Sequence, residues 1–410
     1  MTSGHPNFNI LPMSFATVPA TAKTTPTPFN VAVPDSAIEE LKTLIKVAKI
    51  APPTYESSRP DAKFGVTTDW IQKAKAEWES FDWCKVEAQI NAFPQYKIAI
   101  DDADQSFDIH FLALFSEKPD AVPILMLHGW PGSVLEFLPI LGILSSRHTP
   151  VNLPYHIIVP SLPGYGFSSP PPLDRLFGLQ DVARLLNTFM VELGFDRYVV
   201  QGGDIGGLTS RILVAEHTNC KAVHMNFCYM TAPPNFDNSS LSASDHRKIA
   251  RSNVFVTSGN SYSLEQATRP STLSFALASS PLALLAWLGE KFMEWTDEDP
   301  SISTILEFVS FYWFTDTIAT SFYPYRDTTP VEKDHVDLST NPKWHIEKPF
   351  GFSAFPKEIL PSPRAWIETT GNLVFYREHE KGGHFAAKEV PETLLLDVED
   401  FVSQVWPEIK

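Results

Sequence analysis

Cysteine is scarce in this chain, which has Cys84, Cys220 and Cys228 as the only three cysteines among its 410 residues. Three thiols cannot form the dense disulfide framework of small secreted proteins, so we expect a reducing compartment and a cytoplasmic location. Cys220 and Cys228 lie eight residues apart, and this spacing does not match the paired cysteines of zinc sites. We therefore interpret them as buried side chains and predict no metal site.

Long apolar runs are also missing. The most apolar stretch covers residues 281–289, whereas a membrane-spanning helix needs roughly 20 apolar residues. No apolar segment typical of a signal peptide precedes Lys23, which is the first basic residue. The sequence therefore predicts a soluble protein without a membrane anchor.

Basic residues are too few to balance the acidic ones. Lys and Arg number 32 against 48 Asp and Glu, which gives a formal net charge of −16. Such an excess of negative charge disfavours nucleic acids and anionic membrane surfaces as partners. A hydrophobic content of 43% is typical of a soluble globular protein, and the length predicts a large core with additions.

Strand-like and helix-like segments alternate from residue 122 onward. Continuous apolar runs of this length are typical of strands that are buried on both faces of a parallel sheet. The expected strands cover residues 122–127, 156–159, 198–200, 222–227, 350–352 and 372–376, and the expected helices include residues 179–193 and 391–405. Repeated units of this kind predict an α/β protein with a mostly parallel, doubly wound sheet.

Two regions do not follow this alternation. Residues 229–345 contain helical, aromatic-rich stretches and predict an inserted helical lid. Near the start, Ser36 and Glu39 predict a capping box, and residues 67–69 predict the start of a second helix. The chain is therefore expected to have four segments: an N-terminal arm and meander that pack on the core (1–100), the first half of the core (101–228), the lid (229–345) and the second half of the core (346–410).

Residues 201–207 (Gln-Gly-Gly-Asp-Ile-Gly-Gly) join an expected strand to an expected helix. A sharp turn with glycine on both sides of a central residue is typical of the nucleophile elbow of α/β-hydrolases. The central residue here is Asp204. An aspartate has an ordinary pKa of about 3.9, so its carboxylate can attack without a base to activate it. Taken alone, the pattern fits a glycine-rich turn with a helix-capping aspartate better, and other parts of the chain must decide.

A histidine after the last expected strand occupies the place of the base in an α/β-hydrolase. His384 is so placed, and His379 lies only five residues before it. Gly382 and Gly383 precede His384 directly and allow a loop to bring its imidazole over Asp204. These glycines favour His384 over His379 as the base.

The third member of a triad should be a carboxylate that follows the preceding expected strand. Glu358 has this position, although a loop glutamate is more often simply exposed. Asp334 and Asp337 are the alternatives, but they lie in a polar stretch with Lys333 and His335 that is typical of solvated loops. We therefore predict Glu358 as the acid.

Residues 128–133 (His-Gly-Trp-Pro-Gly-Ser) directly follow the expected strand 122–127. This is the position of the second oxyanion donor in α/β-hydrolases. We expect the backbone N–H groups of Trp130 and Ile205 to converge on the Asp204 carbonyl oxygen. The alternative, a plain tight turn, does not explain why residues 128–133 stand directly after this strand in the chain order.

Together these motifs resemble those of the microsomal-type epoxide hydrolases and, within them, the soluble fungal enzymes. The resemblance runs from about residue 29 to the end and is carried by residues 128–133, 202–207, 262–272, 325–330 and 382–387. It implies an α/β-hydrolase fold and an epoxide substrate. It also implies that Tyr262 and Tyr325 bind the epoxide oxygen from the lid.

The activity that this resemblance implies is hydrolysis of an epoxide to a vicinal diol through an ester of Asp204. His384, oriented by Glu358, would activate the hydrolytic water, and no cofactor would be needed. Fungal relatives often carry aspartate where this chain has Glu358, although glutamate also occurs in the family. Relatives also suggest a homodimer.

Two other classes of protein share part of this pattern. A haloalkane dehalogenase also uses an aspartate elbow, but such enzymes typically place a halide-binding tryptophan where this chain has Ile205. A hydrolase fold that only binds ligands would not need the set of Asp204, His384 and Glu358. The sequence therefore favours an epoxide hydrolase.

Overall fold

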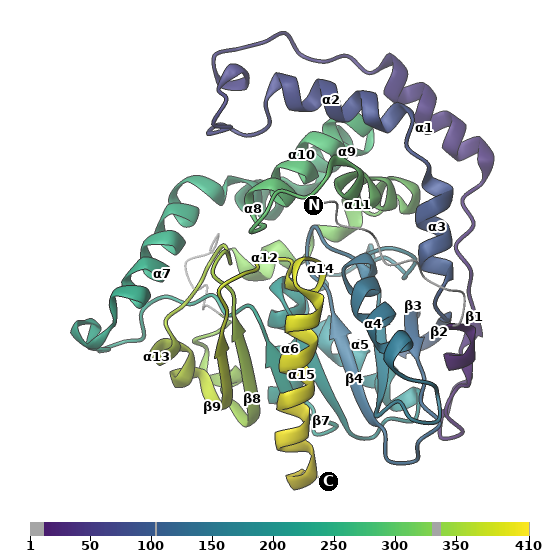
Figure 1. Ribbon diagram of the computed structural model, residues 1–410, viewed down its shortest axis with the longest axis vertical. Coiled ribbons are helices and arrows are strands. Elements are labelled where there is room, and N and C mark those ends of the chain that lie inside the picture. Colours follow the sequence, from purple (N-terminus) through teal and green to yellow (C-terminus); the bar gives the residue numbers. More distant parts are fainter. Residues whose placement is uncertain (1–11, 103–104, 330–337, 410) are drawn as a thin grey trace.

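The computed structural model describes residues 12–102, 105–329 and 338–409 (Figure 1). Its centre is one nine-stranded sheet with the strand order β1-β2-β3-β5-β4-β6-β7-β8-β9. The strands are β1 (Thr27–Pro28), β2 (Gln95–Asp102), β3 (Gln105–Leu114), β4 (Val122–Leu127), β5 (Tyr155–Pro160), β6 (Tyr198–Gly202), β7 (Cys220–Met225), β8 (Ile346–Ala354) and β9 (Gly371–Glu378).

Parallel pairing dominates the sheet. The neighbouring strands in the part of the sheet ordered β5-β4-β6-β7-β8-β9 pair in parallel. The pairs β1 with β2, β2 with β3 and β3 with β5 are antiparallel. Every residue of β4, β5 and β6 is buried, as their continuous apolar runs predict for strands covered on both faces. The predicted mostly parallel α/β sheet is confirmed.

Helices cover both faces of the sheet, and the strand order explains their placement. The step from β4 to β5 runs in one direction along the sheet, and the steps from β5 to β6 and from β6 to β7 run in the other. Right-handed crossovers then place α4 on one face and α5 and α6 on the opposite face. Helix α15 packs against α4. These helices are α4 (Leu138–Arg147), α5 (Leu179–Glu192), α6 (Asp204–Glu216) and α15 (Pro391–Val405).

A group of helices follows β7 in the chain and precedes β8. Figure 1 shows most of them above the end of the sheet where β4 and β6 finish, with α7 to one side. They are α7 (Ala243–Val254), α8 (Ser261–Thr268), α9 (Pro270–Ala278), α10 (Pro281–Glu294), α11 (Ile302–Thr315) and α12 (Pro324–Thr328). Helices are present where the lid was expected, and we keep its boundaries at 229 and 345 as a proposal.

No single helix of the described residues is long and apolar enough to cross a membrane. Helices α9 and α10 would reach that length only together, and they are bent by 116° relative to each other.

The N-terminal region supplies three helices and then enters the sheet through β2. They are α1 (Asp35–Val47), α2 (Thr68–Glu79) and α3 (Trp83–Asn91), and Figure 1 shows α2 above α10. Trp78 on α2 donates from Nε1 to Ser310 Oγ on α11 at 3.0 Å, so this region packs on the inserted helices. The boundary expected after residue 100 falls inside β2.

The two predicted helix starts in this region had different outcomes. Helix α2 begins as expected, because Thr67 caps it by accepting a hydrogen bond from the Trp70 amide at 3.2 Å. The capping box predicted for Ser36 and Glu39 is wrong. Helix α1 begins two residues earlier than a Ser36 cap would give, with Pro34 at its N-cap, and a proline side chain has no acceptor for such a bond.

Candidate active site

Asp204 lies at the sharp turn between β6 and α6. Its φ angle is +47°, a left-handed conformation that is uncommon for any residue except glycine. A Cβ atom on Gly202 would collide with the Gly206 carbonyl oxygen, and one on Gly206 would collide with the Leu127 carbonyl oxygen. The glycines therefore let α6 approach β4 closely enough to hold the strained Asp204 at the tip of the turn.

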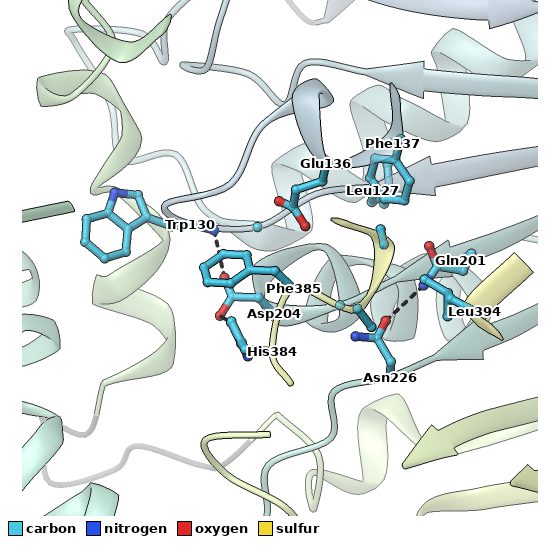
Figure 2. Close-up of a pocket in the computed structure, with 14 residues that line it drawn as sticks. Leu127, Trp130, Glu136, Phe137, Gln201, Asp204, Asn226, His384, Phe385 and Leu394 are labelled. Carbon is cyan, nitrogen blue, oxygen red and sulfur yellow. Dashed lines mark hydrogen bonds and ion pairs between the residues drawn. The ribbon is translucent and has the colours of Figure 1, made fainter. Parts of the chain in front are cut away.

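The Trp130 amide donates a hydrogen bond to Asp204 Oδ1 at 2.8 Å (Figure 2). Trp130 comes from the loop after β4, as the sequence predicted. Ile205 is the second residue of α6, and the first N–H groups of a helix have no partner within it. The Ile205 amide is therefore available as a second donor, and its convergence on the same oxygen stays a prediction. The Trp130 amide therefore contacts Oδ1, whereas Oδ2 is the oxygen nearer to His384.

His384 lies between the two predicted carboxylates. Its Nδ1 is 2.6 Å from Glu358 Oε1, and its Nε2 is 3.2 Å from Asp204 Oδ2. The backbone supports this placement, because Gly382 adopts φ +104° and the His384 amide donates to the Trp295 carbonyl oxygen at 2.9 Å. The structure therefore brings together Asp204, His384 and Glu358 as the sequence predicted.

The charges around His384 decide its protonation. Burial alone would lower the pKa of this imidazole, but the carboxylates of Glu358 and Asp204 outweigh that effect and raise its pKa well above the usual histidine value. In the free protein the imidazole is therefore held as a cation between two anions. Removal of either anionic charge would lower the pKa again.

The alternative base lies in a different part of the structure. His379 directs Nε2 at Asp397 Oδ2, 2.6 Å away, and so belongs to a different polar cluster. Asp334 and Asp337 lie outside the described residues. Glu358 is buried, although glutamates in loops are usually exposed.

Tyr262 on α8 and Tyr325 on α12 meet over Asp204. Their ring centroids are 5.7 Å apart, and Trp130 stacks on Tyr262 and forms a T-shaped pair with Tyr325. Burial raises the pKa of both phenols well above the usual tyrosine value, so both stay protonated hydrogen-bond donors.

A cavity of about 490 Å³ lies in front of Asp204, on the side of the two tyrosines; we call it the front cavity. Among the described residues that line it, Asp204 is the only one with a charged side chain. Its apolar lining includes Leu208, Phe227, Tyr229, Phe255, Val256, Ile359 and Leu360. The arrangement brings a carboxylate and two phenols to a mostly apolar space of the size that small-molecule sites usually have.

Two side chains of this region were not identified from the sequence. Trp295 is buried, and its ring contacts both Tyr262 and His384, with centroids 5.2 and 5.1 Å away. Glu136 follows the loop of Trp130 and is buried behind Asp204. Ser133 and Glu136 have the spacing of a capping box, which gives no sign of a role in a site.

The burial of two cysteines was also predicted from the sequence. Cys220 and Cys228 are buried, as interpreted, and Cys84 is exposed. Within the described part of the chain, no group of three or more His, Cys, Asp or Glu side chains could hold a metal ion.

Comparison with known proteins identifies the family. Residues 26–137 match the family described as epoxide hydrolase N terminus, and residues 122–286 match the alpha/beta hydrolase fold. Epoxide hydrolase 1 of Oryctolagus cuniculus is 32% identical over 426 residues, which cover 92% of this chain and 89% of that protein.

Solved structures agree with this assignment. The epoxide hydrolase of Aspergillus niger has a TM-score of 0.91 and 50% identity, covering 96% of this chain and 100% of that one. The juvenile hormone epoxide hydrolase of the silkworm Bombyx mori has a TM-score of 0.82 and 26% identity, with coverage of 94% and 96%. With this fold and these relatives, the chain belongs to the epoxide hydrolase family.

Proposed function

We propose that this protein hydrolyses epoxides to vicinal diols through a covalent ester on Asp204. One observation carries the proposal: Asp204 faces Tyr262 and Tyr325 on one side and contacts His384 on the other. A nucleophile, two donors for a leaving oxygen and a base are thus available around one carboxylate. The apolar front cavity suits an uncharged, largely apolar epoxide.

The first step opens the ring. Asp204 Oδ2 attacks an epoxide carbon and forms the ester bond, while the ring C–O bond breaks and its electron pair goes to the oxygen. Tyr262 and Tyr325 donate hydrogen bonds to this developing alkoxide, which takes up a proton from the phenol pair. Donors fixed where negative charge develops stabilise the transition state more than the ground state.

The second step releases the diol. Ester formation removes the charge of Asp204, so one of the two groups that raise the pKa of His384 is lost. The imidazolium then returns a proton, through solvent, to the phenol pair that protonated the alkoxide, and the neutral imidazole becomes a base. It takes a proton from water, whose oxygen attacks the Asp204 carbonyl carbon. The oxyanion on Oδ1 is stabilised by the amide of Trp130 and by that of Ile205. Its collapse breaks the ester bond, and the departing diol oxygen takes up the proton that His384 holds. The proton on the new carboxyl group then passes to His384, which restores the Asp204 carboxylate and the imidazolium.

Ile205 separates this proposal from a haloalkane dehalogenase. The position after the nucleophile carries an aliphatic side chain, which offers no donor to a halide. A pair of buried phenols also suits an alkoxide, because the alkoxide can accept their protons. We therefore retain epoxide opening as the single function.

A trapped ester would test this function directly. The His384→Gln variant keeps the nucleophile and both tyrosines, so with styrene oxide it should gain the mass of the whole epoxide and then stall. Asp204→Asn is the matched control and should gain no mass. A single turnover of the wild type in ¹⁸O-water should label Asp204 and leave the first diol unlabelled. Label in the first diol, without an adduct in the variant, would contradict the ester mechanism.

Three finer expectations belong to the same proposal. We propose a homodimer, a cytoplasmic location and a role in the detoxification of reactive epoxides. Sedimentation of the purified protein, fractionation of the source cells and survival of cells exposed to epoxides after deletion of the gene would test them in turn.

A further inference from the structure

A second, much smaller cavity lies behind Asp204; we call it the rear cavity. Its volume is about 20 Å³, and its lining includes Asp204 and His384 but neither tyrosine. A cavity needs about 10–15 Å³ to hold one water molecule, so this one has room for a single water. It therefore borders on the reacting carboxylate and the base, away from the space open to a substrate.

Glu136 supplies a carboxyl group to this cavity. Figure 2 shows its carboxyl group pointing from the segment after Trp130 toward the space beside Asp204. The main chain fixes this direction, because the Ser133 amide hydrogen-bonds to the carboxyl and a Cβ atom on Gly132 would occupy its position. The steps proposed above leave this buried group without a role.

The remaining lining is polar where a water would need partners. Gln201 donates from Nε2 to Asn226 Oδ1 at 3.0 Å, but its own Oε1 is buried without a hydrogen-bond partner among the described residues. His384 Nε2 faces Asp204 without a well-aligned hydrogen bond. A buried water makes about three hydrogen bonds to groups of this kind. Burial also raises the pKa of Glu136 to about 8, so its carboxyl is neutral at pH 7.

We propose that Glu136 is a further catalytic residue, whose carboxyl oxygen accepts a hydrogen bond from the water that His384 deprotonates. The rear cavity is then the site of the hydrolytic water. This inference rests on the ester mechanism proposed above and assigns its second step to a defined place.

The chemistry of the step is balanced without another reactant. One hydrogen of the water goes to His384 Nε2, and the oxygen forms a bond to the Asp204 carbonyl carbon. The second hydrogen stays on that oxygen and is held by Glu136 throughout the attack. A neutral acceptor fits this role, because a carboxylate there would repel the oxyanion that forms on Asp204.

Rapid-mixing kinetics of ester formation and ester hydrolysis test the proposal. Glu136→Met fills a similar length without a strong acceptor, and Glu136→Gln keeps a carbonyl oxygen in place. We expect the methionine variant to form the ester at the wild-type rate and to hydrolyse it about 10- to 100-fold more slowly, as loss of a hydrogen bond to a reacting group predicts. The glutamine variant should hydrolyse the ester within about threefold of the wild-type rate.

The control variant is Glu399→Leu, which removes a half-buried glutamate on α15 that pairs with Arg147 outside both cavities. It should leave both steps unchanged. Glu136→Leu replaces the methionine variant if that protein does not fold.

Three outcomes overturn the role of Glu136. The methionine variant could hydrolyse the ester at the wild-type rate, the glutamine variant could hydrolyse it as slowly as the methionine variant, or the methionine variant could lose as much in ester formation as in ester hydrolysis. Failure of the proposed function is distinct from these, because then the wild type itself would form no ester.

Discussion

Replacement of Glu136 by glutamine should make the protein more stable at neutral pH, although it changes a residue beside Asp204. The carboxyl group is buried, and its pKa is raised from the usual 4.5 to about 8 because burial disfavours the charged form. Above pH 4.5 an unfolded chain releases this proton while the folded protein keeps it. The glutamate therefore costs stability as the pH rises from 4.5 to 8, and a glutamine at the same place does not.

The size of the effect follows from the same shift. At pH 7 the folded protein still holds the Glu136 proton, although this pH lies about 2.5 units above the usual glutamate pKa of 4.5. Each pH unit over which only the folded state keeps the proton costs about 1.4 kcal/mol of stability. The variant should therefore be about 3 kcal/mol more stable than the wild type at pH 7. Glutamine keeps the oxygen that accepts from the Ser133 amide, so this hydrogen bond should not be lost.

Urea unfolding followed by circular dichroism would measure this difference. Between about pH 6 and about pH 7.5 the stability advantage of the variant should widen by about 2 kcal/mol. An advantage that stayed constant with pH, or a variant less stable at every pH, would refute the reasoning. The carboxyl would then be ionised in the folded protein and held by partners stronger than the Ser133 amide.

Three further predictions concern the proposed steps. Glu358→Gln should slow ester hydrolysis far more than ester formation, because this acid acts through His384; equal slowing of both steps in stopped-flow traces would argue against that role. Tyr262→Phe and Tyr325→Phe should each slow ester formation by about 10- to 1000-fold and spare hydrolysis of a preformed ester, and an unchanged rate would leave that tyrosine a packing residue. Ester hydrolysis should fall as the pH falls, with a midpoint below the imidazole pKa that NMR titration finds in the free enzyme, because the ester lacks the Asp204 charge. A midpoint equal to the imidazole pKa of the free enzyme would show that the Asp204 charge does not control the protonation of His384.

The elbow could be predicted because its physical causes are local. A strained aspartate at a strand-to-helix turn needs glycines around it, and those glycines stand beside Asp204 in the sequence. The strands behind it could be predicted from their apolar runs for a similar reason, since burial on both faces determines the side chains directly.

The contacts that complete the site are between distant parts of the chain, and local patterns do not specify them. Tyr262 and Tyr325 were expected only from a family resemblance, because the spacing of a tyrosine on a helix does not show what it faces. Glu136 was missed for a related reason. Its spacing from Ser133 reads as a helix cap, and the Ser133 amide does bond to it, yet the same carboxyl also lines a cavity. One short pattern can serve two purposes, and only the tertiary structure separates them.

The ring contacts around the base have an optical consequence. The Trp295 indole and the His384 imidazole form a T-shaped pair with a centroid distance of 5.1 Å and an angle of 82° between the rings. A protonated imidazole quenches the emission of an indole that it touches, and a neutral one quenches it less. In the proposed mechanism ester formation favours the neutral imidazole, so the intrinsic fluorescence of Trp295 should brighten as the ester accumulates and dim again as the diol leaves. This emission would then report turnover of epoxides that have no chromophore.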